Sequence, residues 1–210
     1  MTAAVSVESL LEEAAEWRLI DLLLQCPSAS ARQQITALAR EVQDPELSAA
    51  AEHAGREAAE GAFHSIFGPG GPAPGREASY QGTIQLGQLM SELKAYYDAF
   101  AYTPASSEPL DHVSVEAGFL GFLRLKQAYA LDRGYESEAT IAAEAAANFV
   151  REHLANIAEP LSAALDDSGE PYLGLTGKAL LRRVGPHPKQ MFDILDEATA
   201  ASEAAFECGP

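Results

Sequence analysis

The chain has 210 residues, of which 31 are acidic and 14 are basic, so its formal net charge is −17. This charge argues against nucleic acid or an anionic membrane as a partner and favours a basic ligand, such as a peptide carrying Arg or Lys, although solubility alone would also explain it. Cys26 and Cys208 are too few for a disulfide framework and show no metal-type spacing.

Helices are expected throughout, because Ala, Leu and Glu dominate and no run alternates with period two over the length of a strand. The first predicted helix covers 6–25, is capped by Ser6 or Ser9, and is ended by Pro27. Ser30 is expected to cap a second helix that runs through Val42. Pro45 then suits the first position of a third helix, which we expect to continue over 46–67.

A segment rich in Gly and Pro follows at 68–75, and it can be neither helix nor strand. No strand precedes it and no Gly-Lys-Ser/Thr follows it, so we interpret it as a rigid connector and not as a phosphate loop. The remaining predicted helices cover 83–100, 113–132, 137–157, 160–166, 171–184 and 188–206.

These elements predict one all-α domain over 1–210, a compact bundle of about eight to ten helices, because we find neither an internal repeat nor a linker long enough to separate domains. The segments 68–80 and 101–111 are expected to be surface loops. No apolar run approaches the roughly 20 residues of a membrane span, and the N-terminus lacks the basic region of a secretory signal. We therefore expect a cytoplasmic protein without stable membrane insertion.

The predicted helix at 113–132 is the most apolar of the set, and its apolar arc is wide enough to indicate a buried helix with others packed around it. One buried face is expected to carry Val115, Phe119, Phe122 and Tyr129. Gly118 and Gly121 each weaken a helix by about 1 kcal/mol relative to Ala, and we expect close approach of a neighbouring backbone to compensate.

Four ionisable residues stand at the start of this helix: Glu108, Asp111, His112 and Glu116. In a purely structural interpretation Asp111 caps the helix, His112 is a surface residue of the first turn, and Glu116 faces solvent or accepts a hydrogen bond from His112. Pro109 restricts Glu108 to extended geometry and so fixes the path of the loop.

Two chemical interpretations compete with the structural one. A catalytic site would use His112 as a general base oriented by Asp111 or Glu116, but the sequence offers no nucleophile motif. A metal site would use His112 and Glu116, four residues apart on one helical face. Its third ligand would come from His64 or His153, and no spacing supports either.

The same residues carry a resemblance to a known family. Glu108-Pro109-Leu110-Asp111-His112, followed by Glu116 and Phe119-Leu120, resembles the E-P-x-D-H-x-x-x-E-x-x-F-L signature of the TorD/DmsD/NarJ family, the cytoplasmic maturation chaperones of molybdenum-containing redox enzymes. Four further segments resemble the family in the right order: 63–69, 77–80 (with Ala78 where Ser is usual), 149–154, and Pro171-Tyr172. The resemblance therefore covers residues 60–180.

The resemblance implies a TorD-like, single-domain helical chaperone without catalytic residues, metal or cofactor of its own. Family members bind the twin-arginine signal peptide, the apo form, or both, of a molybdenum-containing oxidoreductase subunit, and they assist cofactor insertion and assembly before export. The positions associated with signal-peptide binding in the family correspond to Pro109, Asp111 and His112. A receptor for a twin-arginine peptide would use the carboxylates of Glu108, Asp111 and Glu116 for the guanidiniums. Its groove residues would be Tyr80, Phe67 and Phe119.

Two other functions stay open at this stage. A helical adaptor for another basic peptide would explain the acidic charge equally well, and a hydrolase or metal enzyme would depend on His112. A monomer and a domain-swapped dimer are both compatible with helices joined by long hinge loops.

Overall fold

A computed structural model describes residues 5–81 and 85–185 of the chain. Within these residues the fold is helical and contains no strand, and Arg76 and His112 form an isolated antiparallel bridge. The prediction of an all-α bundle is confirmed. The helices are α1 (Val7–Leu23), α2 (Ala29–Leu38), α3 (Pro45–Glu57), α4 (Glu60–Phe67), α5 (Leu86–Ala99), α6 (Val113–Asp132), α7 (Glu136–Phe149), α8 (Ala155–Asp167) and α9 (Pro171–Val184), with a 3₁₀ turn at Glu77–Ser79 and a π turn at Val150–Leu154.

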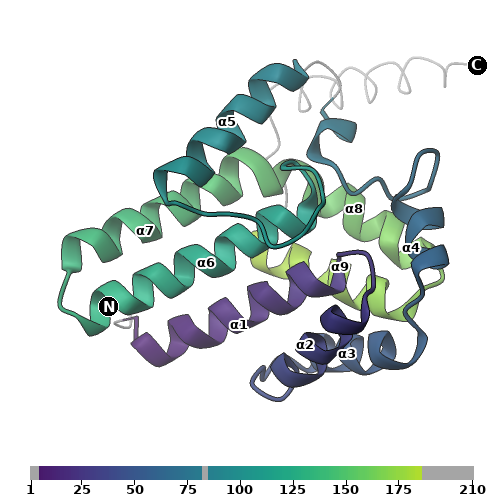
Figure 1. Cartoon of the computed structure of the whole chain (residues 1–210), viewed down its shortest axis with the longest axis horizontal. Helices are drawn as coiled ribbons and strands as arrows, with labels where there is room; N and C mark the ends of the chain where they lie inside the picture. The colour runs from purple at the N-terminus through teal and green to yellow at the C-terminus, as the bar shows by residue number, and fades with distance from the viewer. Residues whose placement is uncertain (1–4, 82–84, 186–210) are drawn as a thin grey trace, which may run out of the picture.

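Helix α6 is central to the arrangement, packing against α1 on one side and α7 on another (Figure 1). Helix α9 packs against α8 and α3 and also contacts α1. A single core of buried hydrophobic residues draws on both groups of helices. The loop between α5 and α6 crosses in front of α6 to reach its N-terminal end (Figure 1).

The bounds of α6 agree with the predicted 113–132, and the helix is buried along most of its length. A Cβ on Gly121 would lie 3.2 Å from the carbonyl oxygen of Ala14, so here the backbone of α1 does approach closely, as expected. Gly118 instead makes room for side chains, those of Tyr102 and Asp21. Tyr129 was expected on the buried face, but it lies toward the exposed end of α6 and is 60 % exposed.

Several predicted boundaries are wrong. Ser28, not Ser30, caps α2 by accepting a hydrogen bond from the Ala31 backbone amide (3.0 Å), and α2 ends before Val42. The helix predicted over 46–67 is interrupted because Ala58 and Ala59 adopt extended backbone angles, which lets α4 start again with Phe63 and Ile66 buried. Helix α8 begins before Pro160 and continues past it.

The predicted helix at 188–206 lies outside the described residues, so the extent of the domain over 1–210 stays a prediction. In the described part of the chain, no helix has the length and apolar character that crossing a membrane requires.

Of the two expected surface loops, 101–110 runs along the surface but 68–80 is partly interior. Ala73 and Glu77 are fully buried. The chain at 75–77 lies alongside the start of α6, where Glu77 N donates to Asp111 O and Val113 N donates to Gly75 O, both at 2.8 Å. This pairing covers the polar residues that begin α6.

Candidate functional site

The polar residues at the start of α6 are interior. Asp111 and Glu116 are fully buried and His112 is 4 % exposed. The expectations that His112 is a surface residue and that Glu116 faces solvent are therefore wrong. Their polarity suggested a solvated helix end, whereas the segment 75–77 covers that end and supplies polar partners to it.

His112, not Asp111, is the N-cap residue of α6. Its Nδ1 accepts a hydrogen bond from the Ser114 backbone amide (3.3 Å) and lies 2.8 Å from Ser114 Oγ. The backbone of Gly75 packs against the other side of the ring, so that even a methyl group there would collide with Nε2. Burial is the largest influence on the imidazole and lowers the pKa of His112 to about 4, so the ring is neutral at pH 7.

Asp111 is paired with an arginine of the same chain. Arg76 Nε donates to both Asp111 oxygens (2.9 and 3.1 Å), and Arg76 Nη2 lies 2.9 Å from Oδ1. The carboxylate is fully buried, whereas the arginine side chain is 41 % exposed. The charge of Asp111 is therefore already matched within the chain, by a residue that the sequence interpretation did not identify.

A second buried pair joins the 3₁₀ turn to the π turn. His153 Nδ1 lies 3.0 Å from Glu77 Oε2, and both side chains are almost completely buried. Asn156 Nδ2 (3.4 Å) and Gln81 donate to the other oxygen of Glu77. A π turn is a rare interruption of a helix and is frequent at functional sites. Here it carries the histidine that anchors the segment 75–81.

Glu116 lies between these two pairs, and both of its carboxyl oxygens are buried. Its hydrogen-bonding neighbour is another acid, the carboxyl of Glu77, which it can reach as a donor only when it is protonated. Burial raises the pKa of Glu116 well above its ordinary value of 4.5, and the nearby carboxyls of Glu77 and Asp111 raise it further. The raised pKa favours the protonated form of this carboxyl, and its complete burial keeps it away from a ligand at the surface.

This arrangement argues against both chemical interpretations of His112. One ring nitrogen is engaged by Ser114 and the other is covered by Gly75, so no substrate can approach the imidazole in this conformation. In the described part of the chain, neither His112 nor Glu116 joins a group of three side chains whose donor atoms could share one metal ion. His153 is engaged by Glu77.

The other predicted site residues divide between surface and core. Pro109 is exposed, and Glu108, Phe67 and Tyr80 are half-buried. The Phe67 ring lies 5.9 Å from the His112 ring, which places it beside the start of α6.

Phe119 is not a groove residue. It is fully buried at the centre of an aromatic cluster, where rings of α5, α7 and the loop after α5 surround it at centroid distances of 4.9–6.3 Å: Tyr96, Tyr97, Phe100, Tyr102 and Phe149. The predicted site residues therefore do not line one open groove. Some lie in or beside the surface loop at 101–110, and the others are buried in the core.

Comparison with known protein families identifies the family of this chain. A model of the nitrate reductase delta subunit family matches residues 28–162, more than half of the chain and including the whole polar network. The chain belongs to this family. The family is the NarJ branch of the TorD/DmsD/NarJ chaperones, as the motifs indicated, and membership implies a role in molybdoenzyme assembly. No curated protein matches the chain at a significant level.

Family motifs that lie far apart in sequence meet in this network. Glu77 comes from the segment 77–80, His153 from 149–154, and Asp111, His112 and Glu116 from the segment that begins α6. Their shared feature is burial with polar partners. In this member of the nitrate reductase delta subunit family, the motif residues join the segment 75–81 and the π turn to the start of α6, where the loop at 101–110 ends.

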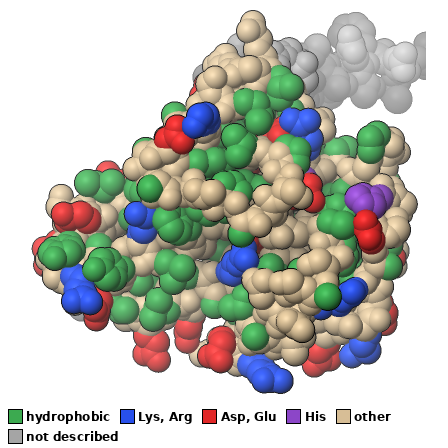
Figure 2. Space-filling view, in the orientation of Figure 1, with side chains coloured by type: hydrophobic (Ala, Val, Ile, Leu, Met, Phe, Trp, Pro, Cys, Tyr) green, Lys and Arg blue, Asp and Glu red, His purple; other side chains and the backbone are tan. Residues whose placement is uncertain are grey.

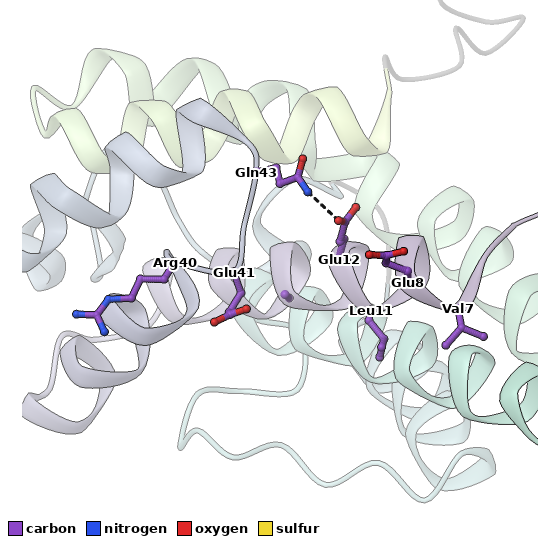
Figure 3. Close-up of a pocket in the computed structure, with 8 residues that line it drawn as sticks. Val7, Glu8, Leu11, Glu12, Arg40, Glu41 and Gln43 are labelled. Atoms are coloured by element: carbon purple, nitrogen blue, oxygen red, sulfur yellow. Dashed lines mark hydrogen bonds between the residues drawn. The ribbon is translucent and has the colours of Figure 1, made fainter.

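Elsewhere the surface offers less specific features. Figure 2 shows acidic side chains spread over several parts of one face, with Lys and Arg among them, and not gathered in a single patch. A cavity of about 640 Å³ lies between α1 and the chain after α2, and Glu8 and Glu12 project toward it from α1 (Figure 3). Gln43 donates to Glu12 across it at 2.9 Å. None of the predicted site residues lines this cavity.

Proposed function

We propose that the chain is a cytoplasmic, non-catalytic chaperone of a nitrate-reductase-type molybdoenzyme. It binds the apo form of the catalytic subunit, and in particular an arginine-bearing N-terminal segment such as a twin-arginine signal, until the molybdenum cofactor is inserted. The observation that carries this proposal is the family match over residues 28–162. The acidic balance of the chain, −17, suits a basic segment.

The contact surface in this proposal is the loop at 101–110 together with the half-buried aromatic residues beside it. Of the three predicted carboxylates, Glu108 alone is reached by solvent. Glu108 is therefore the residue that receives a guanidinium of the client. Pro109, Phe67 and Tyr80 offer the adjoining apolar surface.

The remaining predicted residues act from beneath the surface. Asp111, His112 and Glu116 position the loop through the buried network, and Phe119 positions it through the aromatic core. Tyr97 adds a direct tie, because its hydroxyl donates to the carbonyl of Leu110 at 2.9 Å. A client touches none of these four residues unless the loop moves.

A peptide titration tests the proposal. A twin-arginine peptide from the client should bind, and a version with Lys-Lys in place of Arg-Arg should bind more weakly, because lysine lacks the planar fork that matches a carboxylate. Replacing Glu108→Gln should weaken Arg-Arg binding by about tenfold, since hydrogen bonds between charged groups contribute about 1.5–3 kcal/mol.

Glu144→Gln is the matched control, because it removes the same charge from an exposed position on α7 and should leave binding unchanged. Equal affinity for the Arg-Arg and Lys-Lys peptides would contradict twin-arginine recognition and favour a general adaptor for basic peptides. Equal loss in both glutamate variants would contradict the assignment of Glu108.

A further inference from the structure

A second group of chemically reactive side chains lies outside the buried network. Cys26 follows the end of α1, and Glu60 and His64 are four residues apart on one face of α4. The Cys26 Sγ lies 4.0 Å from His64 Nε2, and His64 Nε2 lies 3.5 Å from Glu60 Oε1. All three donor atoms lie within 4.8 Å of one another, and this is the one such group of three in the described part of the chain.

We propose that Cys26, Glu60 and His64 form a binding site for Zn²⁺ or a similar divalent transition-metal ion, with a water molecule in the fourth position. Zinc prefers thiolate, imidazole and carboxylate donors at about 2.3, 2.0 and 2.0 Å in tetrahedral geometry. Those bond lengths separate the sulfur from the nitrogen by about 3.5 Å and the nitrogen from the oxygen by about 3.3 Å. The observed 4.0 and 3.5 Å need only small side-chain movements to reach them.

The fold already brings the donors together before any metal binds. The i,i+4 spacing on α4 directs the carboxylate and the imidazole to the same side of the helix. His64 is held at the surface beside Phe63, whose ring packs edge-on against it at 5.5 Å, while Phe63 itself is buried. Figure 2 shows a histidine next to an acidic side chain on the surface near α4.

The site is both open and electronegative, as a cation requires. The side chains of His64 and Glu60 are 61 % and 73 % exposed, so an ion can enter from solvent. Cys26 is half-buried, and the neighbouring carboxylates of Glu60 and Glu108 place negative charge around its sulfur. The involvement of Glu108 places this site next to the loop to which we assign client contact, although the metal proposal does not depend on that assignment.

Cobalt titration of the full-length, reduced protein without an affinity tag tests the proposal, because Co²⁺ replaces Zn²⁺ and its bond to a thiolate gives a near-ultraviolet charge-transfer band. We expect one equivalent of Co²⁺ to produce the band and one equivalent of Zn²⁺ to abolish it. Cys26→Ser should remove the band, and His64→Gln should weaken binding by more than about tenfold, since even groups that only orient ligands cost 10- to 100-fold.

Two control variants separate this site from other metal-binding groups. His53 and Glu57 have the same i,i+4 spacing on α3 (3.6 Å) but belong to no group of three donors, so His53→Gln should leave the titration unchanged. Cys208→Ser removes the other cysteine and should also leave it unchanged. Absence of the band, its persistence in Cys26→Ser, or its loss in either control would overturn the proposal. Unchanged far-ultraviolet circular dichroism of each variant excludes unfolding as the cause.

Discussion

The replacement Glu116→Gln examines the most unusual group in the buried network. Glu116 is fully buried, and its neighbours are the carboxyls of Asp111 and of Glu77, the second of which shares a hydrogen bond with it. Burial raises the pKa of Glu116 well above 4.5. Gln has nearly the shape of protonated Glu and cannot ionise, so the variant reproduces the neutral side chain at every pH.

The expected effect is a difference in how stability depends on pH. In the unfolded chain Glu116 ionises near pH 4.5, whereas in the folded chain it stays protonated to a much higher pH. Between these two pKa values the folded state binds the extra proton, so the wild-type protein loses stability as the pH rises. The loss is about 1.4 kcal/mol per pH unit, and it stops where the folded carboxyl itself ionises.

Urea unfolding of the wild type and of Glu116→Gln, repeated at half-unit steps from pH 4.5 to 7, measures this difference. The free energy of unfolding of the variant should rise relative to the wild type, with a slope of about 0.7 kcal/mol per pH unit at pH 4.5 that approaches about 1.4 kcal/mol one pH unit higher. Titrating groups that do not interact with Glu116 contribute equally in both proteins and cancel. Glu144→Gln on α7 is the matched control, because it makes the same replacement at an exposed position.

A difference between Glu116→Gln and wild type that stays flat from pH 4.5 to 6.5 would refute the reasoning. It would mean that Glu116 ionises as readily in the folded protein as in the unfolded one. The carboxyl would then have solvent or a cationic partner, and the network would not be the closed support described above.

Three further outcomes follow from particular contacts. Asp111→Asn should lower the free energy of unfolding in urea by about 1.5–3 kcal/mol, because it breaks the ion pair with Arg76. An unchanged value would mean that this ion pair does not stabilise the fold. Gly118→Ala should lower the free energy of unfolding by about 1–3 kcal/mol, because the added Cβ would lie 2.6 Å from the Tyr102 hydroxyl. Gly55→Ala should raise it by about 0.5–1 kcal/mol, because a Cβ there meets no atom within 4 Å. Equal changes in the two variants would refute the close packing at Gly118. Affinity for a twin-arginine peptide should fall between low salt and physiological salt, and an affinity independent of salt would mean that the acidic surface plays no part in recognition.

The sequence predicted the fold class and the central helix because those depend on local patterns. A wide apolar arc over 113–132 identifies α6, and Pro45 and Pro171 mark the starts of α3 and α9. The break between α3 and α4 carried no such signal, because alanine occupies both extended positions and ordinarily favours helix. Tertiary packing of Phe63 and Ile66 decides the conformation there.

The sequence placed Asp111, His112 and Glu116 together at the start of α6, but it did not predict that they are buried. Their polarity predicted a solvated helix end. Burial depends on Arg76, which is 35 residues from Asp111 in sequence and pairs with it only because the segment 75–77 folds back onto α6. Glu77 and His153, which are 76 residues apart, meet in the same way.

The central claim is that the chain serves a nitrate-reductase-type molybdoenzyme before its cofactor is in place. The most direct measurement compares the affinity of the full-length protein for the catalytic subunit purified without the molybdenum cofactor and for the same subunit loaded with it. We expect the cofactor-free subunit to bind at least tenfold more tightly, a difference of about 1.4 kcal/mol or more. Equal affinity for the two forms, or binding to neither, would contradict the assignment as an assembly chaperone.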